Sequence, residues 1–270
     1  MSDTDMAKLD AMFAQARAEN RAVLLPYLTA GIPDFDSSVA IFEAMSDAGA
    51  DGFEVGIPYA DPLMDGPVIM AAGEYALDHG VTVDVAFDVV SAVVERTGKP
   101  VIAMTYVNPV LRHGVDAFFA KASHAGAAAV IIADLPTDEA APFKQAAADV
   151  GVGLVLFAAP TTDDDRLDRV LAGNPAFVYG IAEVGVTGER VEASTNTAAL
   201  AARIRSRSDV PLVFGVGIST PDHVAKASEV ADGVIVGTAV VRRVMDAATG
   251  EEAAETLSAF VADLVSSTRR

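Results

Sequence analysis

Eight short apolar runs, spaced along the whole chain, constrain its fold more than any other feature. Each run is continuous rather than alternating and is followed by a loop and a helical pattern, which is typical of strands buried on both faces of a parallel sheet. The runs cover residues 22–30, 52–58, 100–108, 128–136, 152–160, 176–182, 210–218 and 232–240. Helical patterns cover residues 36–49, 83–98, 115–126, 139–151, 196–208 and 221–231. This alternation predicts an α/β fold, a single (β/α)8 TIM barrel.

We expect one domain over residues 1–270, because no linker or low-complexity segment divides a chain whose length is common among α/β barrels. An N-terminal helix within residues 1–20 precedes the first strand and should cover the bottom of the barrel. A short extra helix should follow the eighth strand, where residues 236–247 run from a glycine directly into a helical pattern. The alternative is an open doubly wound sheet, but its GxGxxG motif is missing after the first run.

The formal net charge of −19 argues against a nucleic-acid partner, because phosphate backbones are bound through clustered Lys and Arg. With five lysines and many Ala, Val and Asp residues, the composition resembles that of proteins from salt-loving organisms. No apolar run is long enough to span a membrane, and the acidic N-terminus lacks the features of a secretory signal. The absence of cysteine excludes disulfides and fits a cytoplasmic protein.

The lysines and histidines argue against two mechanisms that barrels often use. Four lysines fall in helical patterns, and Lys99 precedes the third strand at the end opposite the expected active site, so a Schiff-base lysine is not supported. None of the histidines has a partner at metal-ligand spacing; they are His79, His113, His124 and His223. A magnesium ion held by carboxylates stays open. Acid–base chemistry by carboxylates remains the leading mechanism.

The stretch FEVGIPYADPLMDGP, residues 53–67, places an acid inside an apolar strand and follows it with a stiff acidic loop. Burial of Glu54 would raise its pKa toward the range that is useful at neutral pH, although a buried ion pair is an equal alternative. Asp65 taken alone is an ordinary turn aspartate, and Asp61 either stiffens the turn or faces a partner. Together, Glu54 and Asp65 form a pair in which the environment can separate acid from base.

Glycines followed by helix starts indicate a phosphate site. The segments 215–222 (GVGISTPD) and 236–247 (VGTAVVRRVMDA) end the seventh and eighth strands and lead into helices. Their backbone N–H groups would converge on an anion, at the position where barrels commonly bind phosphate. Segment 183–190 (EVGVTGER) adds two more glycines after the sixth strand. Because no lysine cluster is present, we expect backbone N–H groups to hold the phosphate.

With these residues in place, the chain resembles the α subunits of tryptophan synthase along essentially its whole length. The segment 53–67 resembles the loop-two motif of that family, which is highly specific. Supporting matches lie at residues 25–34, 103–111, 131–136, 179–190 and 214–220. The resemblance implies a lyase of tryptophan biosynthesis that cleaves indole-3-glycerol phosphate to indole and D-glyceraldehyde 3-phosphate by a retro-aldol reaction. Glu54 and Asp65 would be its catalytic pair.

The resemblance also implies roles for single residues. Glu54 would move a proton between the side-chain hydroxyl of the substrate and ring carbon C3, and Asp65 would hold or take the indole N–H proton. The phosphate would rest on the backbone around Gly188, Val216, Gly217, Gly237 and Thr238. The pocket would be lined by Tyr27, Tyr106 and Tyr179. Thr187 would contact Asp65 when the loop after the sixth strand closes and excludes water.

The family pattern further implies a partner. A β subunit would carry pyridoxal phosphate and join indole to serine, whereas this chain would need no cofactor; an α2β2 heterotetramer is expected. The loop 53–67 with Asp61 would meet that subunit. Two departures stand out: Thr238 replaces the serine of the family, and the acidic Glu183 stands where a basic or neutral residue is expected. The first keeps the hydroxyl; the second could alter loop closure and signalling to the partner.

Two alternative functions are compatible with a phosphate-binding barrel. One is a phosphoribosyl isomerase of histidine or tryptophan biosynthesis on a similar barrel, which usually presents Asp or Cys at the ends of strands one and five. Here those ends read Tyr27-Leu28-Thr29 and Phe157-Ala158-Ala159, which disfavours an isomerase. The other is a non-catalytic subunit that binds a phosphorylated ligand. The presence of both Glu54 and Asp65 argues against it.

Overall fold

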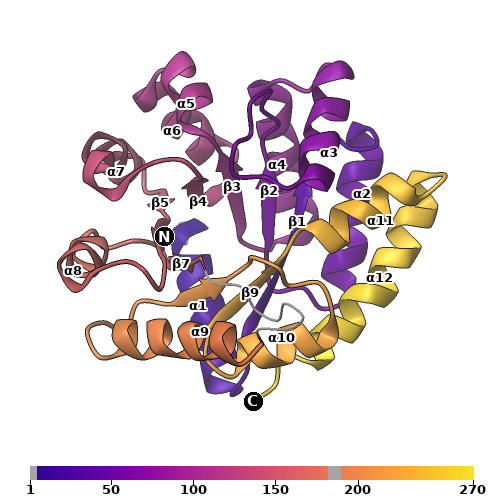
Figure 1. Cartoon of the computed structure of the whole chain (residues 1–270). Helices are drawn as coiled ribbons and strands as arrows, with labels where there is room; N and C mark the ends of the chain where they lie inside the picture. Colours follow the sequence, from indigo (N-terminus) through magenta and orange to yellow (C-terminus); the bar gives the residue numbers. More distant parts are fainter. Residues whose placement is uncertain (1–4, 182–189) are drawn as a thin grey trace.

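The computed structural model describes residues 5–181 and 190–270, and within them a parallel sheet curves into a barrel surrounded by helices (Figure 1). The sheet order is β5-β4-β3-β2-β1-β9-β8-β7-β6. The strands are β1 (Val23–Thr29), β2 (Phe53–Gly56), β3 (Val101–Thr105), β4 (Ala127–Ile132), β5 (Gly153–Leu154), β6 (Leu156–Ala158), β7 (Val178–Gly180), β8 (Leu212–Phe214) and β9 (Gly233–Val236). Each of the eight predicted runs overlaps at least one of them, which confirms the TIM barrel.

The predicted fifth strand is divided in two, and this division closes the barrel. β5 pairs with β4, whereas β6 pairs with β7 at the other edge of the sheet. The single residue Val155 connects the two strands, and its N–H donates to the carbonyl oxygen of Val130 at 3.0 Å. The two edges of the sheet are therefore joined by the chain itself, so the open doubly wound alternative is wrong.

Helices pack around the outside of the barrel in chain order (Figure 1). Their bounds are α1 (Asp5–Ala18), α2 (Phe35–Asp47), α3 (Pro67–Asp78), α4 (Val83–Thr97), α5 (Val107–His113), α6 (Val115–His124), η1 (Thr137–Glu139, a 3-10 turn), α7 (Ala141–Asp149), α8 (Asp164–Ala172), α9 (Arg190–Arg205), α10 (Pro221–Ser228), α11 (Thr238–Asp246) and α12 (Gly250–Ser266). The predicted short helix after the last strand is α11. The helices α3, α5, α8 and α12 lie outside the helical segments predicted above.

Glycines end several of these helices, as their positions in the sequence suggest. Gly49, Gly98, Gly126 and Gly151 all have positive φ, between 66° and 104°. This left-handed conformation is strained for residues that carry a Cβ atom and lets the chain turn back toward the next strand. The chain therefore returns to the sheet within a few residues of each helix end.

Helix α1 lies across the N-terminal ends of the strands. It buries one face of four residues, Leu9, Met12, Phe13 and Ala16. The sulfur of Met12 lies 3.2 Å from the position of a Cβ atom added at Gly52, and a ring carbon of Phe13 lies 3.4 Å from one added at Gly233. Both glycines stand where strands begin. The C-terminal ends of the strands, where barrels carry their active sites, lie at the opposite face.

Among the described residues, no helix is both long and apolar enough to cross a membrane.

Candidate active site

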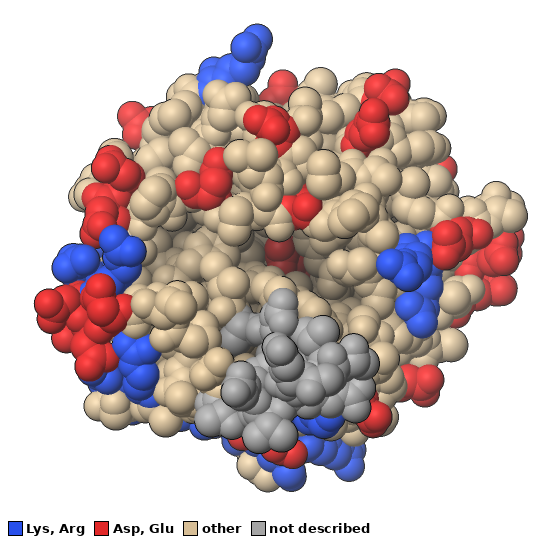
Figure 2. Space-filling view, in the orientation of Figure 1, with Lys and Arg blue, Asp and Glu red and all other residues tan. Residues whose placement is uncertain are grey.

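A cavity of about 630 Å³ opens at the C-terminal ends of the strands. Figure 2 shows this face, which is hollowed at its centre and has acidic side chains in and around the hollow. Most of the predicted site residues line the cavity: Tyr27, Glu54, Asp65, Tyr179, Val216, Gly217, Gly237 and Thr238. The structure therefore brings together residues that are up to 211 positions apart in the sequence, from Tyr27 to Thr238.

Glu54 lies on β2 and is buried, with 4% of its surface exposed. Its Oε2 atom has no hydrogen-bond partner in the described structure. Burial first, and then the negative charge of Asp65, raise the pKa of this carboxyl to about 8. No ion pair of the described residues includes Glu54, so the buried ion pair considered from the sequence does not form there.

Asp65 lies in the loop between β2 and α3 and is half-buried. The loop is shaped by its own backbone, since the N–H of Asp65 donates to the carbonyl oxygen of Pro62 at 3.0 Å. Burial raises the pKa of Asp65, and a hydrogen bond from the hydroxyl of Tyr106 opposes that rise. Two carboxyl groups of different environment therefore face one cavity, which is the arrangement that separates an acid from a base.

Tyr106 does not line the cavity, contrary to the expectation from the sequence. Its side chain is buried beneath the loop of Asp65, with 1% of its surface exposed, and its hydroxyl accepts a hydrogen bond from the N–H of Met64 at 3.3 Å. Its ring packs against that of Tyr59 at a centroid distance of 5.4 Å, and Asn108 donates to the Tyr59 hydroxyl at 3.0 Å. Tyr106 therefore supports the loop that carries Asp65 from the side facing the protein interior.

Tyr27 and Tyr179 line the same cavity as Glu54. Tyr27 is the register partner of Glu54 on the neighbouring strand, and its hydroxyl lies 3.4 Å from Oγ1 of Thr29. Burial is the first cause that raises the pKa of both tyrosines, followed by the charge of Asp65 for Tyr27 and of Glu54 for Tyr179. Both side chains are therefore neutral hydroxyls throughout the physiological pH range.

The glycine turns after β8 and β9 meet at one side of the cavity. Gly217 has φ of 75°, a left-handed conformation that favours glycine. Helix α10 is capped by Thr220, which accepts a hydrogen bond from the N–H of His223, whereas α11 begins after Gly237 without a side-chain cap. The N–H groups of the first turn of α11 are thus available to an anion in the cavity.

Of the other predicted site residues, Thr187 and Gly188 lie outside the described residues, as does Glu183.

Several wall residues were not predicted from the sequence. The apolar ones include Met64, Ile69, Met104, Ile131, Phe157 and Ile235. Their common signal is position, since most of them stand in or next to the loops and strand ends that face the cavity. Arg242 and Arg243 also line it, although a basic pair within a helix is normally taken as part of the solvated surface. Among the described residues, no group of three or more His, Asp or Glu side chains could hold a metal ion.

Comparison with known proteins identifies the family. The family model of the tryptophan synthase alpha chain matches residues 13–268. The tryptophan synthase alpha chain of Chloroflexus aggregans is 40% identical over 266 residues, which are 98% of this chain and 99% of the relative. That of Streptomyces avermitilis is 40% identical over 256 residues, which are 95% of this chain and 92% of the relative.

Solved structures agree with these relatives. A tryptophan synthase alpha chain from Legionella pneumophila superposes with a TM-score of 0.88 at 29% identity, covering 97% of both chains. A tryptophan synthase structure from Mycobacterium tuberculosis gives a TM-score of 0.86 at 35% identity, covering 97% of this chain and 99% of that one. The chain therefore belongs to the tryptophan synthase alpha chain family, which confirms the prediction of a lyase that acts on indole-3-glycerol phosphate in tryptophan biosynthesis.

Proposed function

We propose that Glu54 and Asp65 carry out the retro-aldol cleavage of indole-3-glycerol phosphate to indole and D-glyceraldehyde 3-phosphate. The observation that carries this proposal is the state of Glu54, a buried carboxyl with an unpartnered Oε2 on the cavity wall and a pKa of about 8. At neutral pH such a group is largely protonated and holds a proton that it can give to a substrate.

The steps follow from these two groups. Glu54 gives its proton to C3 of the indole ring, which leaves a positively charged ring nitrogen. The resulting carboxylate takes the proton of the hydroxyl on the adjacent side-chain carbon. The bond between C3 and that carbon then breaks, its electron pair returns to the ring, and an aldehyde is left. Asp65 holds the ring N–H and stabilises its positive charge in the transition state. Since the ring itself accepts the electron pair, these residues need neither a Schiff base nor a metal ion.

The rest of the cavity suits the other parts of the substrate. The apolar wall that includes Met64, Ile69 and Phe157 fits an indole ring. Phosphate would bind on the backbone of Val216, Gly217, Gly237 and Thr238, with Gly188 added by resemblance. Tyr27 and Tyr179 would contact the indole and glycerol portions between them.

The test is release of indole from indole-3-glycerol phosphate by wild type, Glu54→Gln and Asp65→Asn. We expect each substitution to reduce the rate by about 10²-fold or more and to leave substrate binding in place. Glu255→Gln, an exposed position on α12, is the matched control and should behave as wild type. Normal turnover by Glu54→Gln would refute the mechanism. If wild type releases no indole even with a β subunit present, the chain is instead a non-catalytic binder of a phosphorylated ligand.

We infer that the partner is a tryptophan synthase β subunit in an α2β2 heterotetramer, with pyridoxal phosphate in the β subunit and no cofactor in this chain. Exposed apolar side chains support a partner surface, since Leu63 is 79% and Met64 58% exposed in the loop before α3, and Leu111 on α5 is 56% exposed. Sedimentation of the mixed subunits tests this assembly. Two separate species at micromolar concentrations would count against it.

We also infer that the protein works in the cytoplasm at high salt. Its net charge of −19 supports this, because crowded surface acids repel one another at low ionic strength. At 1 M salt the reach of a surface charge falls to about 3 Å, so repulsion among the acids weakens. The thermal midpoint should therefore rise with salt. Melting curves that are the same at about 0.1 M and about 1 M salt would contradict this.

A further inference from the structure

Two arginines are the basic side chains that line the cavity among the described residues. Arg242 and Arg243 both belong to α11, the helix whose first turn borders the proposed phosphate site. The surrounding chain is strongly acidic, with 38 Asp and Glu residues against 19 Lys and Arg residues. Two arginines on the wall of a substrate cavity are unusual in such an acidic chain. The two side chains differ in their contacts.

Arg243 is engaged within the protein. Its guanidinium lies 3.5 Å from the centre of the Phe260 ring, and it donates a hydrogen bond to the carbonyl oxygen of Ala239 at 2.8 Å. Phe260 belongs to α12, so this cation–π contact ties α11 to its neighbour. Arg243 is half-buried, and its charge is used for packing.

Arg242 has no such contact. It is exposed, and no hydrogen bond or ion pair of the described residues involves its guanidinium, although exposed acids are abundant nearby in the sequence. Arg242 follows Thr238 by four positions, so the two share one face of α11. Side chains in a helix lean toward its N-terminus, which directs Arg242 back over the first turn of α11.

We propose that Arg242 binds the phosphate group of the substrate and supplies the full positive charge that the backbone cradle lacks. This proposal rests on the proposed function, because it assumes a phosphorylated substrate. A phosphate monoester carries about −1.5 to −2 charges at pH 7, whereas the end of a helix supplies only about +0.5. A guanidinium donates two parallel hydrogen bonds to phosphate oxygens, which a lysine ammonium does not match.

The location also matters for how the substrate arrives. In a protein with a net charge of −19 the surface repels a phosphorylated ligand at long range. An unpaired cation at the mouth of the cavity opposes that repulsion at the point where the phosphate enters. The phosphate would therefore be held by Arg242 in addition to the backbone N–H groups expected from the sequence.

The experiment measures binding of sn-glycerol 3-phosphate, a phosphate probe that is not cleaved, by calorimetry at low salt. Wild type is compared with Arg242→Gln, Arg242→Lys and Arg269→Gln, the last of which removes the same charge from an exposed position outside the cavity. We expect Arg242→Gln to weaken binding about ten- to hundredfold, Arg242→Lys to weaken it less, and Arg269→Gln to bind as wild type. Loss of Arg242 should also flatten the dependence of affinity on salt.

Two results would overturn the proposal: binding by Arg242→Gln that equals wild type, or no binding of glycerol 3-phosphate by wild type. A thermal melt of each variant checks that it folds. In steady-state assays with indole-3-glycerol phosphate, KM should rise for Arg242→Gln by more than kcat falls. Because the probe needs no cleavage, failure of the proposed reaction is distinguishable: wild type would then bind glycerol 3-phosphate through Arg242 and release no indole.

Discussion

The hydroxyl of Tyr179 occupies the space above Gly215, so that a Cβ atom added at position 215 would lie 1.9 Å from it. The two residues lie on neighbouring segments, since Tyr179 is on β7 and Gly215 follows β8 directly. Both line the cavity. On this side of the active site, the side chain of Tyr179 fits against the wall only because residue 215 is a glycine.

This contact predicts a paired effect. Gly215→Ala should destabilise the protein by about 1–3 kcal/mol, because the side chain of Tyr179 must shift, and it should also impair indole release. Adding Tyr179→Leu to the Gly215→Ala variant should restore part of the lost stability. Urea unfolding of the two single variants and the double variant measures this coupling. Gly73→Ala on α3 is the control, since its nearest neighbour would lie 4.0 Å from the new atom. Additive effects of the two substitutions would contradict the contact.

The raised pKa of Glu54 predicts how stability depends on pH. The folded protein keeps a proton on Glu54 up to a pKa of about 8, whereas the unfolded chain loses it near the ordinary glutamate pKa of 4.5. Between these values the folded state binds more protons, so this group lowers the free energy of unfolding as pH rises, by at most about 1.4 kcal/mol per pH unit. Glu54→Gln should remove this effect.

Urea unfolding of wild type and Glu54→Gln at pH 5.5, 7 and 8.5 measures this difference. The variant should gain stability over wild type as pH rises, with the smallest difference at the lowest pH. A constant difference across the series would show that Glu54 is ionised in the folded protein. The rate of indole release by wild type should also fall above a pH of about 8, since the proton that Glu54 gives to C3 is then lost.

Tyr106 is predicted to position Asp65 and to hold down its pKa. Tyr106→Phe keeps the ring against Tyr59 but removes the hydrogen bond that lowers the pKa of Asp65. The acidic limb of the pH–rate profile should therefore move to higher pH, and the rate at neutral pH should fall by about tenfold, as for the loss of one hydrogen bond. Tyr59→Phe, which loses only the bond from Asn108, is the control. An unchanged acidic limb in Tyr106→Phe would refute the positioning role.

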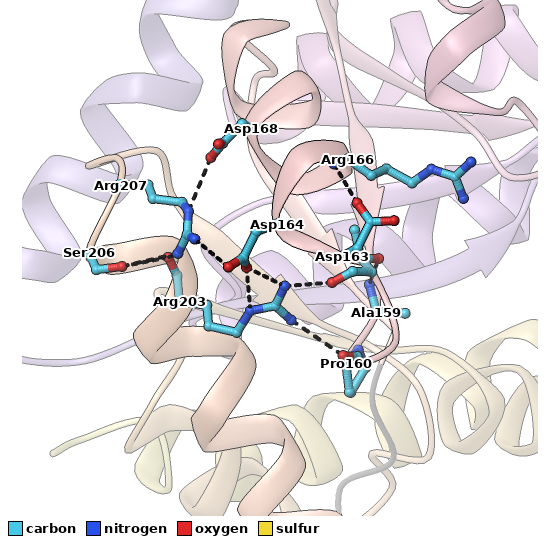
Figure 3. A network of polar contacts seen from close by, with 10 residues as sticks. Ala159, Pro160, Asp163, Asp164, Arg166, Asp168, Arg203, Ser206 and Arg207 are labelled. Atoms are coloured by element: carbon cyan, nitrogen blue, oxygen red, sulfur yellow. Dashed lines mark hydrogen bonds and ion pairs between the residues drawn. The ribbon is translucent and has the colours of Figure 1, made fainter.

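A network of arginines and aspartates joins α8 to α9 (Figure 3). Arg203 donates to the carbonyl oxygens of Thr162 at 2.5 Å and Pro160 at 3.3 Å and also pairs with Asp164. Arg207 pairs with both Asp164 and Asp168. Because Arg203 also satisfies loop carbonyls, it does more than neutralise a surface acid.

The network predicts an unequal result for its members. Arg203→Ala should lower the free energy of unfolding by about 1–2 kcal/mol, since two carbonyl groups lose a charged donor. Asp168→Asn removes one exposed ion pair and should change it by less than about 1 kcal/mol. Urea unfolding at about 0.1 M and 1 M salt separates the two, because salt screens the exposed pair and leaves the hydrogen bonds. If both variants lost the same free energy of unfolding at low salt and neither lost any at about 1 M salt, the hydrogen bonds of Arg203 to the loop carbonyls would not contribute to stability.

The barrel and the centre of its active site could be predicted from the sequence because local patterns encode them. Continuous apolar runs predict buried strands, and the glycines that end helices take the left-handed conformation they were expected to take. Glu54 stands out because a carboxyl inside such a run must lose its water, whatever the final register. These inferences need only the neighbours of a residue along the chain.

Only the tertiary structure decided which side chains meet across the barrel. The division of the fifth strand at Val155 follows from closure, since one short segment must pair with both edges of the sheet. Tyr106 turns behind Asp65, Tyr179 covers Gly215, and Arg242 reaches the cavity while Arg243 packs on Phe260. Each of these contacts depends on strand register and helix rotation. Contacts between residues far apart in the chain set both, and no periodicity within one segment records them.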